Sequence, residues 1–262
     1  MKTTTLADVV SWLDATFHPE YQENYDNAGF LLGVGSTPYH GALVALDLTP
    51  EVINEAVDLE HNLIVTHHPF IFSGIKRLTD RTETGRMVIS LIRNNMAVYA
   101  AHTNLDNLPW GVSGILAEKL GLQHCSILKE NEANIGSGIV GELPEPMSAD
   151  AFLLRVKELT HQPSIRTSLH DPKKKIHRIA LCGGAGADFL PDAIAAHADL
   201  YLTADLKYHD FQRPEGRLIL ADAGHYETEQ FAKEIICHAI SEKFINFACS
   251  ISRKQGSIIQ YI

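Results

Sequence analysis

The sequence lacks most of the features that assign a chain to a specialised class of protein. Only four cysteines occur among 262 residues, and no two of them form a CxxC pair. This scatter favours reduced thiols in a cytosolic protein. No apolar run is long enough to cross a bilayer. The first helical stretch contains Asp8 and Asp14 and is not the continuous apolar core of a signal peptide. We therefore expect a soluble cytoplasmic protein with no membrane partner.

An excess of positive charge is also missing. The chain has 22 lysines and arginines against 32 aspartates and glutamates, for a formal net charge of -10. This balance makes a nucleic-acid partner unlikely on electrostatic grounds. The hydrophobic content of 45% and charged content of 21% are ordinary for a soluble globular protein. The length allows one large domain or two smaller ones.

Short apolar runs alternate with helical stripes over the first half of the chain. Thr49 and Pro50 illustrate the pattern, because a helix N-cap and a first-turn proline directly follow a strand-like run. We expect helices at 6–17, from 50, at 83–94 and at 112–120, and strands at 42–48, 63–66 and 97–101. This alternation indicates a mostly parallel α/β sheet.

A segment rich in glycine and proline at 131–146 interrupts the alternation. We expect a second lobe to open there with a strand at 137–142. The further expected helices are 149–159, 188–196 and a long one from 225 to 244, and the further strands are 178–182, 200–203, 218–221, 245–249 and 257–262.

Polar side chains follow four of these expected strands directly. The clusters are His67-His68, His102 to Asp106, Asp205 to His209, and Asp222 to Glu229. In open α/β sheets, ligands bind beyond the carboxyl ends of the strands. Histidines and carboxylates from separate segments form a mixed N/O set that suits divalent transition metals. The combination therefore predicts metal-assisted chemistry.

Each cluster taken alone has an ordinary structural explanation. The histidine pair could be one core and one surface imidazole, and His102 with Asp106 could cap a turn. His225 and Glu229 would share a helix face four residues apart, which is more often a solvated contact than a metal site. Asp222 could be only a helix-entry residue. The metal interpretation depends on the clusters occurring together.

Two further motifs are open to more than one interpretation. Leu181-Cys182-Gly183-Gly184-Ala185-Gly186 lies between a strand and a helix and could bind an anion through backbone N–H groups. It lacks a Walker lysine and the GxGxxG spacing, so a plain tight turn is an equal alternative. Tyr25-Asp26-Asn27-Ala28-Gly29 could be a simple turn.

Five motifs follow one another along the chain. They are Tyr25-Asp26-Asn27-Ala28-Gly29, Thr66-His67-His68-Pro69, His102-Thr103-Asn104-Leu105-Asp106, Thr203-Ala204-Asp205-Leu206-Lys207-Tyr208-His209 and Gly224-His225-Tyr226-Glu227-Thr228-Glu229. Together they resemble the signatures of the type 2 GTP cyclohydrolase I homologue family, also called the Nif-three-like family, in its short form. The resemblance runs from residue 25 to residue 229. Tyr25 departs mildly from it, since members often carry Trp there.

The resemblance implies a two-lobed α/β fold with mostly parallel sheets, helices packed on them, and a dinuclear metal centre in the cleft between the lobes. Residues 1–128 plus 222–262 would form the first lobe and carry most metal ligands, and residues 129–221 would form the second. A toroidal homohexamer is also implied. Carried over to this sequence, the metal ligands are His67, His68, Asp106, His225 and Glu229.

Five ligands are too many for one ordinary zinc, but they suit two divalent ions that share bridging carboxylates. Asp106 and Glu229 are the expected bridges, and zinc, iron and manganese all fit such ligands. His102 and His209 are candidate catalytic residues, as proton carriers or as groups that orient a ligand. Lys207 is a candidate for contact with a substrate phosphate.

Two classes of function follow from this interpretation. The first is a metal-dependent hydrolase acting on GTP, as the family name suggests, or on another phosphate-bearing small molecule. The second is a metal-binding scaffold or regulator that acts through protein partners. Fold alone does not decide between them.

Overall fold

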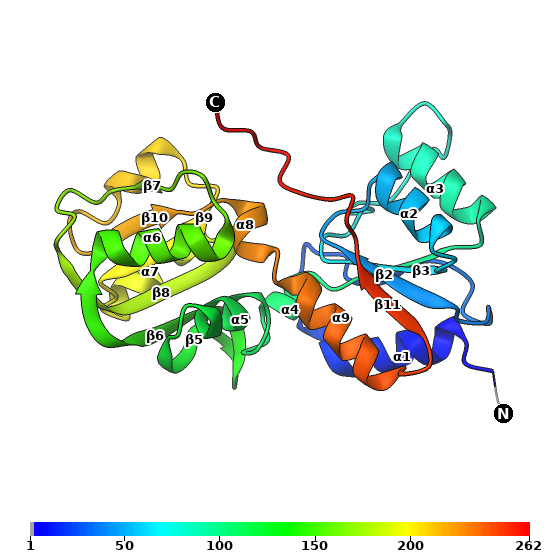
Figure 1. The fold of residues 1–262 in the computed structure, drawn as a ribbon, viewed down its shortest axis with the longest axis horizontal. Helices are drawn as coiled ribbons and strands as arrows, with labels where there is room; N and C mark the ends of the chain where they lie inside the picture. The colour runs from blue at the N-terminus through cyan, green and yellow to red at the C-terminus, as the bar shows by residue number, and fades with distance from the viewer. Residues whose placement is uncertain (1–2) are drawn as a thin grey trace. The chain divides into compact units, whose positions relative to one another are not determined.

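The computed structural model describes residues 3–262 and divides into two compact units (Figure 1). The first unit comprises residues up to Leu105 together with Ala232–Gly256, and the second comprises Asp106–Phe231 with Ser257–Ile262. Each unit has its own β-sheet with helices, which confirms the mixed α/β class. No helix in the described part of the chain is long and apolar enough to cross a membrane.

The sheet of the first unit has the strand order β1-β4-β3-β2-β11. Its strands are β1 (Gly29–Leu32), β4 (Ala97–Ala100), β3 (Leu63–Thr66), β2 (Gly41–Ala45) and β11 (Ala248–Ile251). Only the β1–β4 pairing is antiparallel. Every residue of β2, β3 and β4 is buried, which explains why these strands are continuous apolar runs in the sequence.

The helices of the first unit are α1 (Leu6–Phe17), α2 (Pro50–Asp58), α3 (Glu83–Arg93) and α9 (Ala232–Lys243), with a 3-10 turn η1 (Pro19–Tyr21) after α1. Three of them, α1, α2 and α3, begin at threonine side-chain caps. Thr5 and Asp8 form a capping box at the start of α1. Thr49 accepts from the Val52 N–H at the start of α2, where Pro50 takes the first helical position as predicted.

The sheet of the second unit is mixed. Its strand order is β5-β6-β8-β9-β10-β7, with β5 (Gln123–Glu132), β6 (Ile135–Ser148), β8 (Lys175–Ala185), β9 (Leu200–Ala204), β10 (Ile219–Asp222) and β7 (Arg166–Thr167). The β8–β9 and β9–β10 pairings are parallel, whereas β5–β6, β6–β8 and β7–β10 are antiparallel. The expectation of mostly parallel sheets therefore holds only for the first unit, because the second adds a hairpin and a short edge strand.

Two hydrophobic clusters form the core of the second unit. Neighbouring residues of one strand contribute to different clusters, as Ile139 and Val140 do on β6. The cluster that holds Ile139 also contains Leu116 of α5 and Phe152 of α6, and the other contains Leu190 of α7. The helices involved are α5 (Val112–Lys119), α6 (Ala149–Thr160) and α7 (Leu190–Ala195), which follows a 3-10 turn η2 (Ala187–Phe189).

Several elements differ from the sequence expectation. Residues 106–128, 222–231 and 257–262 were expected in the first lobe but group with the second unit. For the first two segments the reason is that α5 and the short helix α8 (His225–Glu229) contact β8 there. The boundary between the units falls inside the helix α4 (Thr103–Asp106). The long helix expected at 225–244 is divided into α8 and α9. Residues 257–262 form no strand, and β5 was not expected because its residues are mostly exposed and polar.

Candidate metal centre

Three histidines of the first unit gather at the carboxyl ends of β3 and β4. His67 and His68 directly follow β3, and His102 follows β4, which is its parallel neighbour in the sheet. Ring nitrogens of the three residues all lie within 4.8 Å of one another, so they could hold a metal ion. Parallel neighbouring strands bring their carboxyl ends to one edge, which is why residues separated by a helix in the sequence meet here.

An oxygen atom holds the Nδ1 of each of these three imidazoles. His67 Nδ1 lies 2.7 Å from the Ala101 carbonyl oxygen. His68 Nδ1 lies 2.7 Å from Oδ1 of Asp47, and His102 Nδ1 lies 2.8 Å from Oδ1 of Asp26. A carbonyl or carboxylate oxygen accepts a hydrogen bond, so Nδ1 is the nitrogen that donates its proton and Nε2 is the one that can bind a metal. Imidazoles that bind metals are commonly held in this way.

Asp26 belongs to the Tyr25-to-Gly29 motif, and the structure gives that motif a positioning role. Its side chain is fully buried and accepts hydrogen bonds from the Thr103 backbone N–H at 3.1 Å and from the Thr103 hydroxyl. Burial opposes the charged form, but the hydrogen bonds from His102 and Thr103 outweigh burial and lower the pKa of Asp26 to about 2. Asp26 is therefore ionised at neutral pH and fixes the His102 ring.

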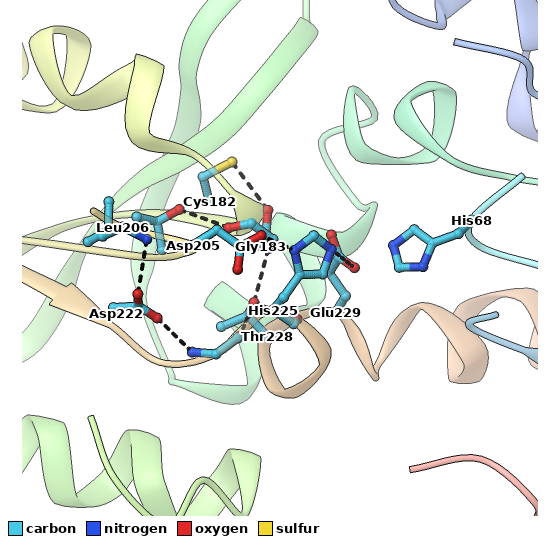
Figure 2. Close-up of polar contacts among 12 residues, drawn as sticks. His68, Cys182, Gly183, Asp205, Leu206, Asp222, His225, Thr228 and Glu229 are labelled. Carbon is cyan, nitrogen blue, oxygen red and sulfur yellow. Dashed lines mark hydrogen bonds and ion pairs between the residues drawn. The ribbon is translucent and has the colours of Figure 1, made fainter. Parts of the chain in front are cut away.

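In the second unit, His225 lies between two carboxylates (Figure 2). Its Nδ1 is 2.8 Å from Oδ2 of Asp205, and its Nε2 is 3.0 Å from Oε2 of Glu229, one turn along α8. Burial disfavours the charged ring, but the hydrogen bonds to Asp205 and Glu229 prevail and raise the pKa of His225 to about 10. A divalent metal that bound this pair would take the place of the proton.

The glycine run at the end of β8 makes room for Glu229. Gly184 has a φ of +65°, and its backbone N–H donates to the Thr228 hydroxyl at 3.0 Å. A Cβ atom on Gly184 would lie only 2.0 Å from Oε1 of Glu229. A side chain at this position would therefore push the carboxylate away. In this structure the run serves to seat a buried glutamate.

Asp106, at the end of α4, lies near the same part of the second unit. Burial raises the pKa of the Cys182 thiol to about 12, and the charges of Asp106 and Glu229 add to that effect. Both carboxylates are thus close enough to the end of β8 to act on one thiol. Two acidic groups in this environment favour a cation as their partner.

The predicted ligands divide between the two units. His67 and His68 lie in the first, whereas Asp106, His225 and Glu229 lie in the second. Their convergence on one centre stays a prediction. Sequence reasoning noted the motifs that contain Asp26 and Asp205 but did not identify these residues, or Asp47, as partners of the histidines. The spacing along the chain gives no signal for such a pair, because each carboxylate lies about twenty or more residues from its histidine.

The candidate His209 has a different environment from His225. It is exposed on the 3-10 turn η3 (Tyr208–Gln212), with its Nδ1 3.5 Å from Oε1 of Gln212 and its ring 5.2 Å from that of Tyr208. Asp222 has a structural role, since it accepts from the backbone N–H groups of Leu206 and Gly224. Lys207 donates its backbone N–H to Asp210 at the start of η3.

The side chains present fit a divalent transition metal. Imidazoles with oxygen atoms on Nδ1, together with a buried glutamate next to a histidine, are typical of zinc, iron and manganese sites. Gly184 is further support, because a side chain at this position would displace the Glu229 carboxylate.

Comparison with known proteins agrees with these motifs. Residues 4–255 match the family described as Duf34/NIF3 (NGG1p interacting factor 3). The chain belongs to this family. The resemblance drawn from its sequence motifs is therefore confirmed.

Named relatives and solved structures extend the comparison. A "GTP cyclohydrolase 1 type 2 homolog" of Clostridium acetobutylicum is 36% identical over 214 residues, 79% of each chain. One of Nostoc sp., with the same name, is 35% identical over 242 residues, 91% of this chain and 90% of the relative. The crystal structure of a Staphylococcus aureus hypothetical protein has a TM-score of 0.92 at 28% identity, and covers 100% of both chains. A Bacillus cereus protein related to NIF3 shares the fold over 100% of both chains, with a TM-score of 0.94 at 21% identity.

Proposed function

We propose that this protein is a metal-dependent hydrolase of a phosphate-bearing small molecule, with GTP as the first candidate. The observation that carries the proposal is the set of three histidines, His67, His68 and His225, each with Nδ1 held by an oxygen atom at 2.7–2.8 Å. Such a set prepares Nε2 atoms for metal ligation. The name of the relatives is the reason for placing GTP first.

In the proposed enzyme, two divalent ions would be held by the predicted ligands. His67, His68 and His225 would contribute nitrogen ligands, and Asp106 and Glu229 would contribute carboxylate oxygens. Bound ions of this kind supply Lewis acidity and lower the pKa of water. Zinc, iron and manganese are the candidate metals.

The residues around this set would orient the ligands and move protons. Asp26 holds His102 at Nδ1, so Nε2 of His102 is the atom that would accept a proton from the attacking water and return it to the leaving group. Asp205 and Asp47 would keep His225 and His68 in fixed orientations. His209 is a second candidate proton carrier, from an exposed position on η3.

The experiment that tests this proposal is a reconstitution of metal-free protein. The chelated protein should be loaded separately with zinc, iron(II) or manganese and incubated with GTP, other nucleotides and simple phosphoesters. We expect turnover of at least one of these substrates to depend on added metal. A fully metal-loaded protein that turns over none of them would contradict the hydrolase and favour a metal-binding scaffold.

A further inference from the structure

A pocket lies in the second unit, beside the segment that carries Asp205. This pocket has a volume of about 490 Å³ and is lined by side chains that include Arg166, His170, Tyr208, Phe211 and Gln212. Arg166 begins β7, which pairs with the end of β10, and η3 follows the end of β9. The pocket therefore lies at the β7 edge of the sheet, near the carboxyl ends of two parallel strands, where α/β sheets commonly bind ligands.

Arg166 is held in a fixed orientation at this pocket. Its Nη2 donates to the Leu206 carbonyl oxygen at 2.8 Å and to Oδ2 of Asp222 (Figure 2 shows Asp222 and Leu206). The guanidinium carbon also lies 5.7 Å from the centre of the Phe211 ring. These contacts order the side chain before any ligand arrives, which reduces the entropic cost of binding.

The remaining donors of this arginine are available for a ligand. Within the described residues, no hydrogen bond uses Nε or Nη1 of Arg166, and its side chain is 59% exposed. Asp222 already accepts the Leu206 and Gly224 backbone N–H groups, so its carboxylate serves the fold as well as the arginine. A guanidinium with N–H donors to spare forms charge-assisted hydrogen bonds with phosphate or carboxylate oxygens.

Tyr208 supplies an aromatic surface at the same pocket. The residue is 75% exposed, so much of the ring is open to a ligand at the pocket. The face of Phe211, by contrast, is already covered by Arg166. Tyr208 is therefore the ring on which a planar ligand could stack.

We propose that this pocket binds a planar aromatic or heteroaromatic molecule that carries an oxyanion, with the anion on Arg166 and the ring on Tyr208. A volume of about 490 Å³ suits a small molecule of this class. Leu206, whose carbonyl oxygen anchors Arg166, directly follows Asp205, which orients His225. The inference that this ligand is the substrate rests on the proposed function. The inference that the pocket binds such a ligand is independent of it.

Binding should be measured by calorimetry on chelated, metal-free protein, so that metal ligation cannot contribute. Phenyl phosphate and benzoate share a ring and differ in the anion. Guanosine 5′-monophosphate carries both ring and anion, whereas guanosine has only the ring and inorganic phosphate only the anion. We expect saturable binding of guanosine 5′-monophosphate and of at least one of the two phenyl probes. The tighter phenyl probe identifies the anion as phosphate or carboxylate. Guanosine and inorganic phosphate alone should each bind at least ~10-fold more weakly than the nucleotide.

Two variants assign the contacts. Arg166→Lys keeps the charge but loses the fixed guanidinium, and should weaken nucleotide binding ~10-fold or more. Tyr208→Leu changes an exposed residue and leaves the fold intact, and should weaken binding of the nucleotide but not of inorganic phosphate. Arg253→Lys, an exposed arginine of the first unit, is the matched control and should change nothing. Nucleotide binding that is absent, or is unaltered in both Arg166→Lys and Tyr208→Leu, would overturn the proposal.

The same variants distinguish this proposal from that of the hydrolase. If no metal-dependent turnover exists but the two variants weaken binding, the hydrolase is contradicted and the pocket stands. If metal-dependent turnover exists and both variants retain wild-type KM and binding, the pocket is contradicted and the hydrolase stands.

Discussion

The Nδ1 of His225 lies 2.8 Å from Oδ2 of Asp205, and the backbone of Asp205 has a φ of 56°, in the left-handed region. A non-glycine residue in this conformation carries a local cost, which the surrounding structure must offset. The same histidine–carboxylate contact recurs between His68 and Asp47 and between His102 and Asp26. The acidic partners of these histidines are therefore part of the site.

Asp26 should stabilise the first unit in a pH-dependent way. Its pKa is about 2 in the folded protein against an ordinary value of 3.8, so the ionised form favours folding. This contribution is fully present above pH 3.8 and is lost as the pH falls towards about 2. We expect Asp26→Asn to lower the free energy of unfolding by roughly 2 kcal/mol at pH 7.

Urea denaturation of the wild type and of Asp26→Asn at pH 7 and at pH 2.5 would test this expectation. The difference between the two proteins should shrink at the lower pH. Asp58→Asn is a control for loss of an exposed carboxylate in the same unit. A difference that stays the same at both values would show that Asp26 does not act through its charge.

Gly184→Ala should impair metal binding with little loss of the sheet. The new Cβ would meet Oε1 of Glu229 at 2.0 Å, and the φ of +65° adds backbone strain. We expect the metal content of the purified variant to fall well below that of the wild type, as measured by elemental analysis. Gly74→Ala is a matched control, since a Cβ there meets no atom within 4 Å. Equal metal content in the two variants would argue against this role of Gly184.

The family resemblance predicts a toroidal homohexamer. Light scattering at working concentration should give about six times the 29.0 kDa monomer mass. Dilution should not change that mass if the ring is a stable assembly. A species near 29.0 kDa would contradict this expectation.

The sequence predicted those parts of the fold that depend on local pattern. Buried parallel strands such as β3 and β4 are continuous apolar runs, so His67 and His102 could be placed at their ends. β5 could not be predicted in the same way, since its residues are mostly exposed. The end of the helix at Glu229 and the space beside Gly184 depend on packing against β8. The hydrophobic periodicity of the sequence does not indicate such a contact.

Glu229 joins metal binding to hydrolysis in the proposed mechanism, so Glu229→Ala should remove both. Glu242→Ala is the matched control, because Glu242 also pairs with a histidine four residues earlier, His238, but at an exposed position. Metal content and nucleotide turnover should be measured together on both variants and on the wild type. We expect Glu229→Ala to stay folded, to lose metal and to lose turnover by several orders of magnitude, while Glu242→Ala matches the wild type. Full turnover in a Glu229→Ala protein that has lost its metal would contradict the account.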